Sequence, residues 1–370
     1  MHATLTELKG FFSKSMTQVL SGHNKENRVF SPINLYLALS AMAEMTGGDG
    51  QIMEALNASD LETLRQRTLE LWAHCNAGTK ELASSIWLDN GLSYDQQVMD
   101  HLARYHSTSV YQSNLGSHQT NQDIRNWMNG MTGGLLKDSA NGVDVSPNAV
   151  FALFSTIYYK AAWGSSFNVL QNEPGLFHGP DGDTLCIYMH KKEEPDPGLE
   201  PRYYYWGEDF GAIRWGPMWL ILPDKDKTVD DVLAAGEWAE MVMADHKWAQ
   251  AKPVYVNLKL PKFDVRDSSS LIPDLQAMGI TDVFDPDQAD FTAAFPKSQG
   301  LAYLSEYSQV TRVAIDEEGI YAASYIKGEG EIAGDIPAGK DIDFFLDRPF
   351  LFVITTSSRI PLFAGIVNTP

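Results

Sequence analysis

The predicted helices and strands are segregated along the chain, and this segregation constrains the fold more than any other feature. Helical periodicity fills the first third, at residues 4–20, 32–46, 61–75, 95–106 and 120–131. Strand-like apolar runs fill the last two fifths, at 219–223, 254–263, 349–356 and 361–367. Separate blocks predict an α+β fold rather than an alternating α/β fold. No repeat or low-complexity linker interrupts the 370 residues, so we expect one domain over 1–370.

Two segments carry more specific local signals. Ser31 is a good N-cap, followed by Pro32 at the first helical position, where a missing N–H costs nothing. The glycines Gly47 and Gly48 predict the end of that helix. Residues 149–159, AVFALFSTIYY, form a continuous apolar run, which predicts a strand covered on both faces.

Composition excludes several classes of partner. The net charge is 28 − 48 = −20, so the surface repels phosphate, and nucleic acids and heparin-like polyanions are disfavoured.

Cys75 and Cys186 are the only cysteines, which excludes a disulfide framework; we expect two free, partly buried thiols, although one bridge stays open. No apolar run approaches the roughly 18 residues of a membrane helix. The N-terminus carries no secretion signal, so the chain is either not exported or a mature form.

The usual catalytic and cofactor signatures are missing. The sequence contains no G-x-S-x-G, H-E-x-x-H, C-x-x-C or Walker loop, so we expect no enzyme activity. The glycines of GEGEIAG (328–334) have the wrong spacing for a dinucleotide, and the neighbouring acids would repel a pyrophosphate. His101 and His106 lie five residues apart, which does not place them on one helix face, so we expect surface histidines, no metal and no cofactor.

The stretch EEGIYAASYIKGEGEIAGDIPAGK, 317–340, has two unlike halves. The first half alternates as a strand does, whereas the second half breaks into glycine, proline and single acids. From Ile320 to Glu331 every charge falls on one parity, and the other parity is small or aliphatic. No proline occurs from 317 to 336. The first half is therefore fit to become a strand with one face buried.

Several segments, in chain order, resemble the serpin family. They are NRVFSPINLYLALSAMAEMTGGDG, WMNGMTGGLLKD, STIYYKAAWGSSF, KLPKFDV, LQAMGITDVFDPDQADF, IDEEG, DRPFLFVI and PLFAGIVNTP, and together they cover essentially all of the chain. The resemblance implies an α+β fold with three β-sheets, eight or nine helices and an exposed reactive centre loop at about 317–345. The IDEEG segment is more similar to prokaryotic members.

The resemblance also implies a mechanism, suicide-substrate inhibition of a serine-type endopeptidase. The protease cleaves the loop, stays attached by its acyl bond, and is distorted when the first half of the loop inserts into the central sheet. The implied hinge is Glu317, Glu318, Gly319, Ile320, Tyr321, Ala322 and Ala323. Two hinge positions depart from the family pattern: Ile320 replaces a small hydroxylic residue, and Tyr321 replaces a glutamate. Ile320 would point inward, where an apolar side chain is tolerable and a charge would be costly.

The family spacing places the scissile bond near the end of the alternating half. Fourteen residues beyond Gly319 give Ala333–Gly334, and one fewer gives Ile332–Ala333. The loop is longer than usual, so Ile336 and Ala338 stay open as alternatives, whereas Lys327 lies too near the hinge and Lys340 too far from it. With no arginine in the loop, we expect elastase-like or subtilisin-like targets, and papain-like proteases stay open.

A buried polar cluster, the shutter, and one tryptophan complete the sites that the resemblance implies. The shutter positions are Ser31, Asn34, Ser155 and Gln309, three of which differ from the usual residues. Asparagine and serine have exchanged places, and Gln309 stands where the family has histidine, so we expect a rewired but satisfied network that does not titrate. The breach, where the loop begins to insert, is assigned to Trp163.

The partner expected from the resemblance is a target protease held in a covalent complex by a monomeric inhibitor. Serpins often meet proteases outside the cell, so we expect a secreted or extracellular protein whose signal is not in this chain, with a cytoplasmic protein as the alternative. The alternative function is a non-inhibitory serpin that acts as a carrier, chaperone or storage protein.

Overall fold

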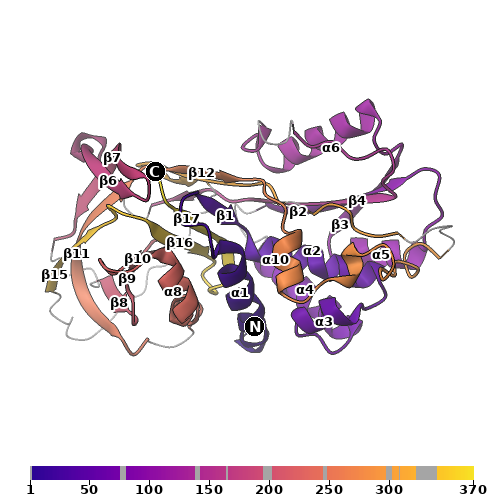
Figure 1. Ribbon diagram of the computed structural model, residues 1–370, viewed down its shortest axis with the longest axis horizontal. Coiled ribbons are helices and arrows are strands. Elements are labelled where there is room, and N and C mark those ends of the chain that lie inside the picture. Colours follow the sequence, from indigo (N-terminus) through magenta and orange to yellow (C-terminus); the bar gives the residue numbers. More distant parts are fainter. Residues whose placement is uncertain are drawn as a thin grey trace. The chain divides into compact units, whose positions relative to one another are not determined.

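The computed structural model describes residues 2–75, 81–137, 142–163, 166–194, 202–244, 248–296, 302–307, 309–321 and 340–370. Within these residues the chain forms nine α-helices and three β-sheets, which confirms the predicted α+β class (Figure 1). Neither Cys75 nor Cys186 is in a disulfide. Among the described helices, none is long and apolar enough to cross a bilayer.

The chain folds into two compact units. Unit 1 comprises Met1–Val19, Ser31–Tyr158 and Ser268–Thr311, and unit 2 comprises Leu20–Phe30, Tyr159–Asp267 and Arg312–Pro370. Each unit is assembled from three separated stretches of chain. The single domain expected over 1–370 stays a prediction.

Unit 1 contains most of the helices. They are α1 (His2–Leu20), α2 (Pro32–Met45), α3 (Gly50–Ala55), α4 (Leu61–Cys75), α5 (Gln96–Tyr105), α6 (His118–Met131), α10 (Ile272–Ala277) and the 3₁₀ turn η2 (Asp282–Phe284). The predicted start of α2 is confirmed: Ser31 Oγ accepts a hydrogen bond from the Asn34 N–H, and Pro32 follows the cap. All residues of α2 are buried, as expected of a helix that is mostly apolar on all sides.

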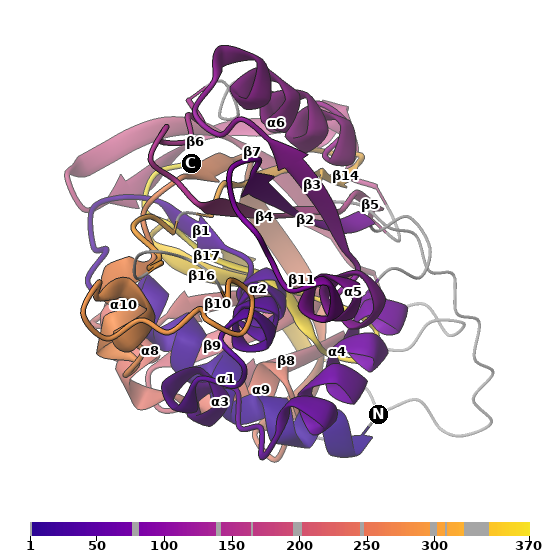
Figure 2. The same ribbon diagram turned by 90° about the vertical axis from the view of Figure 1, so that its right-hand side faces the viewer.

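The sheet of unit 1 has three strands in the order β3 (Thr108–Ser113), β2 (Glu81–Asp89) and β4 (Phe151–Tyr158). Figure 2 shows α6 lying over one side of these strands, where its residues Ile124 and Met128 pack with Trp87 of β2. No residue of β4 is exposed: Ala152 and Phe154 pack on the α6 side, and Ser155, of the other parity, contacts Asn34 of α2. The run 149–159 is therefore covered on both faces, as predicted, although most of its side chains are only partly buried. β4 is an edge strand, with β2 as its only strand partner among the described residues.

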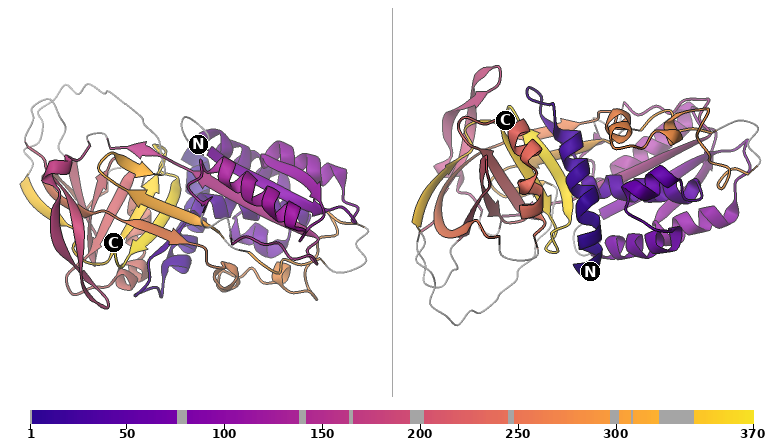
Figure 3. Two further views of the ribbon diagram at one scale, coloured as in Figure 1. Left: turned by 90° about the horizontal axis from the view of Figure 1, so that it is seen from above. Right: turned by 60° about the horizontal axis from the view of Figure 1, so that its bottom comes forward.

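Unit 2 contains a ten-stranded sheet with helices α8 (Val229–Ala235) and α9 (Glu237–Val242) and the 3₁₀ turn η1 (Val169–Gln171) beside its strands. The strand order is β1 (Arg28–Phe30), β17 (Pro361–Val367), β16 (Phe350–Thr355), β10 (Met218–Pro223), β9 (Phe210–Trp215), β8 (Arg202–Trp206), β11 (Ala251–Pro261), β7 (Gly182–Lys192) and β6 (Glu173–Gly179). The tenth strand, β15 (Lys340–Phe345), runs parallel to β11 (Figure 3).

A four-stranded sheet carries the residues of the expected hinge. Its order is β12 (Asp264–Asp267), β13 (Thr311–Ile315), β14 (Gly319–Tyr321) and β5 (Ala161–Ala162). β14 is antiparallel to both neighbours, so it is an interior strand although it is only three residues long. The segment that sequence reasoning treated as the start of a loop is therefore already a strand.

Candidate functional site: the hinge, the shutter and a buried ionic cluster

The hinge begins with a tight hairpin turn over IDEEG. The backbone N–H groups of Glu318 and Gly319 both donate to Asp316 Oδ1, at 2.8 and 3.1 Å, and the Asp316 N–H donates to the Gly319 carbonyl at 2.9 Å. An aspartate that caps its own turn in this way fixes the chain reversal. The reversal brings β14 back alongside β13 and pairs Ile320 with Ile315.

On the other edge, β14 pairs with β5 at very close range. A Cβ added at Gly319 would lie 1.9 Å from the Ala161 carbonyl oxygen, so only glycine fits this position. The next residue, Ile320, lies between Ala161 and Ile315 in the strand register and is 1% exposed. An aliphatic side chain therefore fills this buried position, where the family usually has a small hydroxylic residue.

The Glu317 side chain is held beside the turn by two partners that sequence reasoning missed. Lys262 Nζ lies 2.5 Å from Glu317 Oε1, and the Asn172 amide donates to the same oxygen. Burial alone would raise the pKa of Glu317, but the hydrogen bonds from Lys262 and Asn172 lower it below the ordinary value. Lys262 lies in the KLPKFDV segment that carried the resemblance, but nothing in the sequence pairs it with Glu317.

Trp163 is attached directly to the hinge turn. Its indole Nε1 donates to the Asp316 carbonyl at 2.7 Å, and its backbone N–H donates to the Glu318 carbonyl at 3.1 Å. The ring is buried and meets Phe167 edge to face, and the Phe167 N–H donates to the Glu317 carbonyl. The structure therefore brings the assigned breach residue and the first three assigned hinge residues into one hydrogen-bonded group.

The other loop positions singled out in the sequence lie, except for Lys340, beyond the residues that the structure describes. Ala322, Ala323, Lys327, Ile332, Ala333, Gly334, Ile336 and Ala338 lie outside the described residues, so their assignment stays a prediction. Lys340 is described: it opens β15 and pairs with Val254 of β11. The residues between the two described strands, 322–339, lie within the loop expected at about 317–345, whose extent stays a prediction.

All four shutter residues belong to unit 1, where they form two hydrogen-bonded pairs. Gln309 Oε1 accepts from the Ser31 N–H at 2.5 Å, and Gln309 Nε2 donates to the Ser31 carbonyl at 3.2 Å. The side-chain amide of Gln309 thus binds both backbone polar groups of Ser31. Thr311, which sequence reasoning missed, also donates its hydroxyl to Gln309 Oε1.

The second pair joins α2 to β4. Asn34 Nδ2 donates to the Ser155 carbonyl at 3.0 Å, and the Ser155 hydroxyl donates back to Asn34 Oδ1. No buried side-chain nitrogen or oxygen of the four shutter residues lacks a partner within the described part of the chain. Asn34 and Ser155, which are exchanged relative to the family pattern, therefore satisfy each other's hydrogen-bonding groups, as a satisfied network requires.

A second polar cluster in unit 1, the Glu44 cluster, corrects an expectation. Glu44 is 2% exposed and binds Arg65 through both carboxylate oxygens, at 2.6 and 2.9 Å. His101 Nδ1 lies 2.7 Å from the same carboxylate, and His106 Nε2 lies 3.6 Å from it. Burial favours the neutral acid, but His106, Arg65 and His101 lower the pKa of Glu44 to about 2. The expectation of surface histidines is wrong, because α5 packs against α2 and α4, and His106 is 2% exposed.

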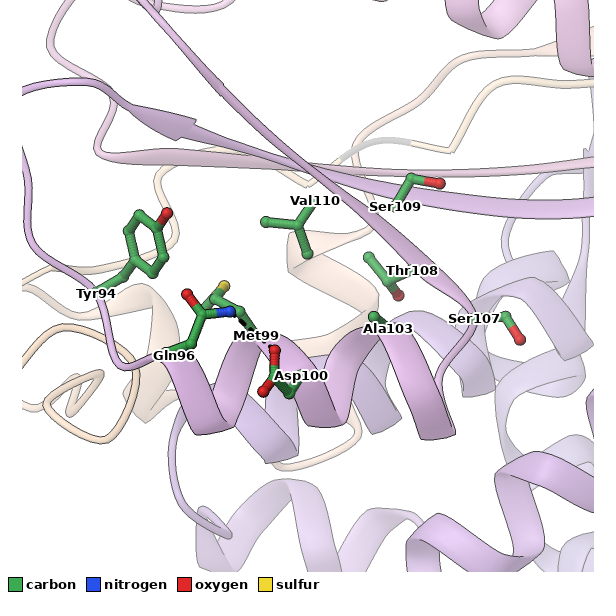
Figure 4. A pocket seen from close by; sticks show the side chains of 9 residues that line it. All are labelled: Tyr94, Gln96, Met99, Asp100, Ala103, Ser107, Thr108, Ser109 and Val110. Atoms are coloured by element: carbon green, nitrogen blue, oxygen red, sulfur yellow. Dashed lines mark hydrogen bonds between the residues drawn. The ribbon is translucent and has the colours of Figure 1, made fainter.

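A cavity of about 620 Å³ lies between α5 and β3 (Figure 4). Among the described residues, Asp100 is the only charged one that lines it, and Gln96 donates to this carboxylate at 2.8 Å. The described lining contains no histidine, cysteine or lysine. Within the described residues, no group of acidic, histidine or cysteine side chains is placed to hold a metal ion.

These features define an α+β protein in which the expected reactive loop begins as a paired interior strand. Residues 7–370 match the family model described as "Serpin (serine protease inhibitor)", so the chain belongs to the serpin family. It is 26% identical to plasminogen activator inhibitor 1 of Sus scrofa, over 97% of this chain and 91% of that protein.

Two solved structures show the same fold. The native state of tengpin, a thermophilic serpin, matches with a TM-score of 0.82 and 22% identity, over 100% of this chain and 95% of that one. Thyroxine-binding globulin in complex with thyroxine matches with a TM-score of 0.78 and 20% identity, over 98% and 99%. Serpins are mostly protease inhibitors rather than catalysts and act on target proteases.

Proposed function

We propose that this serpin is a suicide-substrate inhibitor of elastase-like or subtilisin-like serine proteases, cleaved at Ala333–Gly334 or Ile332–Ala333. Cleavage lets the loop extend β14 as a new strand while the protease stays attached as an acyl-enzyme. The protease supplies the nucleophile, and the serpin supplies a binding loop and the free energy of strand formation.

The observation that carries this proposal is the pairing of β14 on both edges. Starting a strand between two others is the unfavourable step, since its backbone groups must find partners on both sides at once. Here Gly319, Ile320 and Tyr321 have already taken that position. We expect the inserted strand to continue β14 beyond Tyr321.

The first test mixes the full chain with elastase-like, subtilisin-like, trypsin-like and papain-like proteases. Denaturing gels should show a covalent complex with a member of the first two classes. Mass spectrometry of the released C-terminal peptide should find it beginning at Gly334 or Ala333. Main inhibitory cleavage after Lys340 would contradict the assigned bond, and clean cleavage without a complex would contradict the mechanism.

The second test separates insertion from cleavage. Ile320→Arg places a charge at a position that is 1% exposed, so the variant should be cleaved normally but form little covalent complex. Tyr321→Arg is the matched control, because strand alternation places residue 321 on the opposite face. Equal complex formation by both variants would argue against insertion at this hinge.

A non-inhibitory carrier is the second candidate, favoured by the similarity to thyroxine-binding globulin, whose solved complex contains thyroxine. Heating separates the two functions. A chain cut in its loop should melt well above the intact chain if the loop inserts, because the sheet gains a strand. A carrier whose loop does not insert should show no such gain.

The proposal also covers the oligomeric state of the inhibitor, where it meets its protease and whether polyanions activate it. We expect a monomer that meets its protease outside the producing cell, without activation by heparin-like polyanions, since the net charge is −20. Gel filtration, fractionation of the producing cells and inhibition rates with and without heparin test these points separately.

A further inference from the structure

The exposed apolar side chains of the protein are concentrated in one short part of the chain. Five of the eight large apolar side chains that are exposed among the described residues come from residues 169–187. They are Val169 and Leu170 of η1, and Leu176, Leu185 and Ile187 of the β6–β7 hairpin, which forms one edge of the ten-stranded sheet of unit 2 (Figure 1). We call these five residues the apolar patch.

The strand register places the hairpin members of the apolar patch on one face. Leu176 pairs directly with Leu185, and Ile187 follows two residues later on β7, so the three side chains point the same way. Lys191 has the same parity as Leu185, and its Nζ donates to the Ser166 carbonyl at 3.1 Å. The segment that leads into η1 therefore crosses this face of the hairpin, and η1 itself lies beside β7.

The apolar patch is hydrogen-bonded to the start of the hinge. Asn172, the C-cap of η1, donates to the Glu317 carboxylate, which also binds Lys262 Nζ. The Lys262 backbone N–H in turn donates to the Ile187 carbonyl at 3.0 Å. On the far side of the loop, β15 begins at Lys340 and pairs with β11, which also pairs with β7. A protease held on the residues between β14 and β15 would therefore be within reach of the patch.

Although β6 is an edge strand, its backbone offers little to an added strand. Pro174 has no N–H to donate. The Leu176 carbonyl already accepts from the Tyr188 hydroxyl at 3.0 Å. The His178 N–H already donates to the Asp347 carbonyl at 2.7 Å. A partner must therefore bind through the side chains of the apolar patch rather than by strand pairing.

The size and charge of this surface select the kind of partner. Five exposed side chains of this type present on the order of 500 Å² of apolar surface, whereas a stable interface buries about 800 Å² on each partner. Two copies of the chain would also bring together two net charges of −20. The apolar patch is therefore too small to hold a free partner. It suits a protein that is already attached through the neighbouring loop, because each further contact is then intramolecular.

We propose that the apolar patch is a secondary docking site for the target protease, which it binds through an apolar surface outside the active-site cleft. This inference rests on the proposed function. The patch stabilises the reversible complex that precedes cleavage, so it raises the rate of inhibition without changing the fate of the cleaved loop. Among proteases that accept the loop, it favours those with exposed apolar side chains beside the cleft.

The double variant Leu176→Ser/Leu185→Ser tests the proposal with the protease that forms the covalent complex fastest. Its second-order rate constant of inhibition should fall by about tenfold or more, because two apolar contacts are lost. The number of serpin molecules consumed per protease should not change, since the hinge and the loop are intact. Tyr303→Ser is the control, at a side chain of unit 1 that is 41% exposed, and should change the rate constant less than about twofold.

Leu170→Ser repeats the test at the most exposed side chain of the patch, outside any strand. It should also slow inhibition and leave the melting temperature unchanged. Rate constants equal to the wild type in both patch variants would overturn the docking site and leave the proposed function standing.

A protease whose catalytic serine is replaced by alanine isolates the binding step, because it cannot form the acyl bond. The double variant should bind it about tenfold more weakly than the wild type does. Patch-dependent binding without any covalent complex of the active protease would overturn the proposed function alone, and the absence of any binding would overturn both. A wild-type dimer in gel filtration that dissociates in the double variant would show that a second copy covers the patch, and would overturn the choice of a protease.

Discussion

The two ends of α2 carry buried polar clusters of opposite kinds. At its N-terminus the shutter contains only neutral groups, with Ser31 and Asn34 paired to Gln309 and Ser155. At its C-terminus Glu44 is charged and is surrounded by a guanidinium and two imidazoles. A neutral network can exchange partners at a cost of about 1 kcal/mol per hydrogen bond, whereas a buried charge cannot leave its partners without a much larger penalty. One end of the helix is therefore suited to rearrange, and the other end anchors it.

The largest effect should follow from Glu44→Gln. This change leaves Arg65 without its buried carboxylate, and breaking such a pair typically costs about 3–5 kcal/mol. Urea unfolding measures the loss. Glu62→Gln is the matched control, since Glu62 also approaches Arg65, at 3.5 Å, but is 63% exposed, so its loss should be within about 0.5 kcal/mol. Equal losses for the two variants would remove the contrast between the ends of α2.

The next effect concerns the neutral end. Gln309→Leu leaves the Ser31 N–H without its acceptor and removes the acceptor of the Thr311 hydroxyl, so we expect a loss of about 2–3 kcal/mol. Urea unfolding of the full chain again measures it. The loss should not depend on pH between 5 and 8, because no member of the shutter titrates there. Gln309→His should introduce such a dependence, and a pH-dependent wild-type shutter would contradict the assignment.

The sequence predicted the shutter far better than the Glu44 cluster. Ser31 and Pro32 form a local N-cap signal, and the resemblance supplied the two distant shutter positions. Glu44 gave no comparable signal, because an acid near the end of a helix usually faces water. Its burial depends on Arg65 and His101, which lie 21 and 57 residues further along the chain. Charge pairs between helices have no periodicity in sequence, which is why His106 was expected on the surface.

At the hinge, too, sequence reasoning missed the contacts between residues that lie far apart in the chain. Alternation and the absence of proline predicted a segment fit to become a strand, and residues 319–321 form one. The sequence could not show that this strand is already paired on both sides, because β5 is only two residues long and carries no strand signal of its own. Nor could it show the contact of Lys262 with Glu317, which depends on tertiary packing.

A smaller effect should appear as a pH dependence at the charged end. Burial lowers the pKa of His106 from 6.5, while Glu44 opposes this shift and Arg65 and His101 add to it. The unfolded chain therefore binds this proton first as the pH falls. Stability should drop from pH 6.5 downward, by at most about 1.4 kcal/mol per pH unit, until His106 itself is protonated.

Urea unfolding at pH 7.5, 6.5 and 5.5 measures this slope. His106→Gln should reduce it, and His74→Gln, the same change at an exposed histidine, should leave it unchanged. An identical slope in the His106 variant would mean that other groups cause the pH dependence of unit 1.

The smallest effect, and the closest test of the comparison, comes from exchanging Asn34 and Ser155. Ser155→Ala should cost about 1 kcal/mol or less, because Ser155 is only half-buried and water can replace its hydrogen bond to Asn34.

In the exchange experiment, Asn34→Ser alone leaves a short side chain that cannot span to β4. Adding Ser155→Asn restores a long amide from the other side, so the double variant should be more stable than the sum of the single changes predicts. A coupling of about 0.5 kcal/mol or more in that direction would show that a neutral cluster tolerates rewiring, whereas strictly additive losses would mean that its present arrangement is as fixed as the Glu44 cluster.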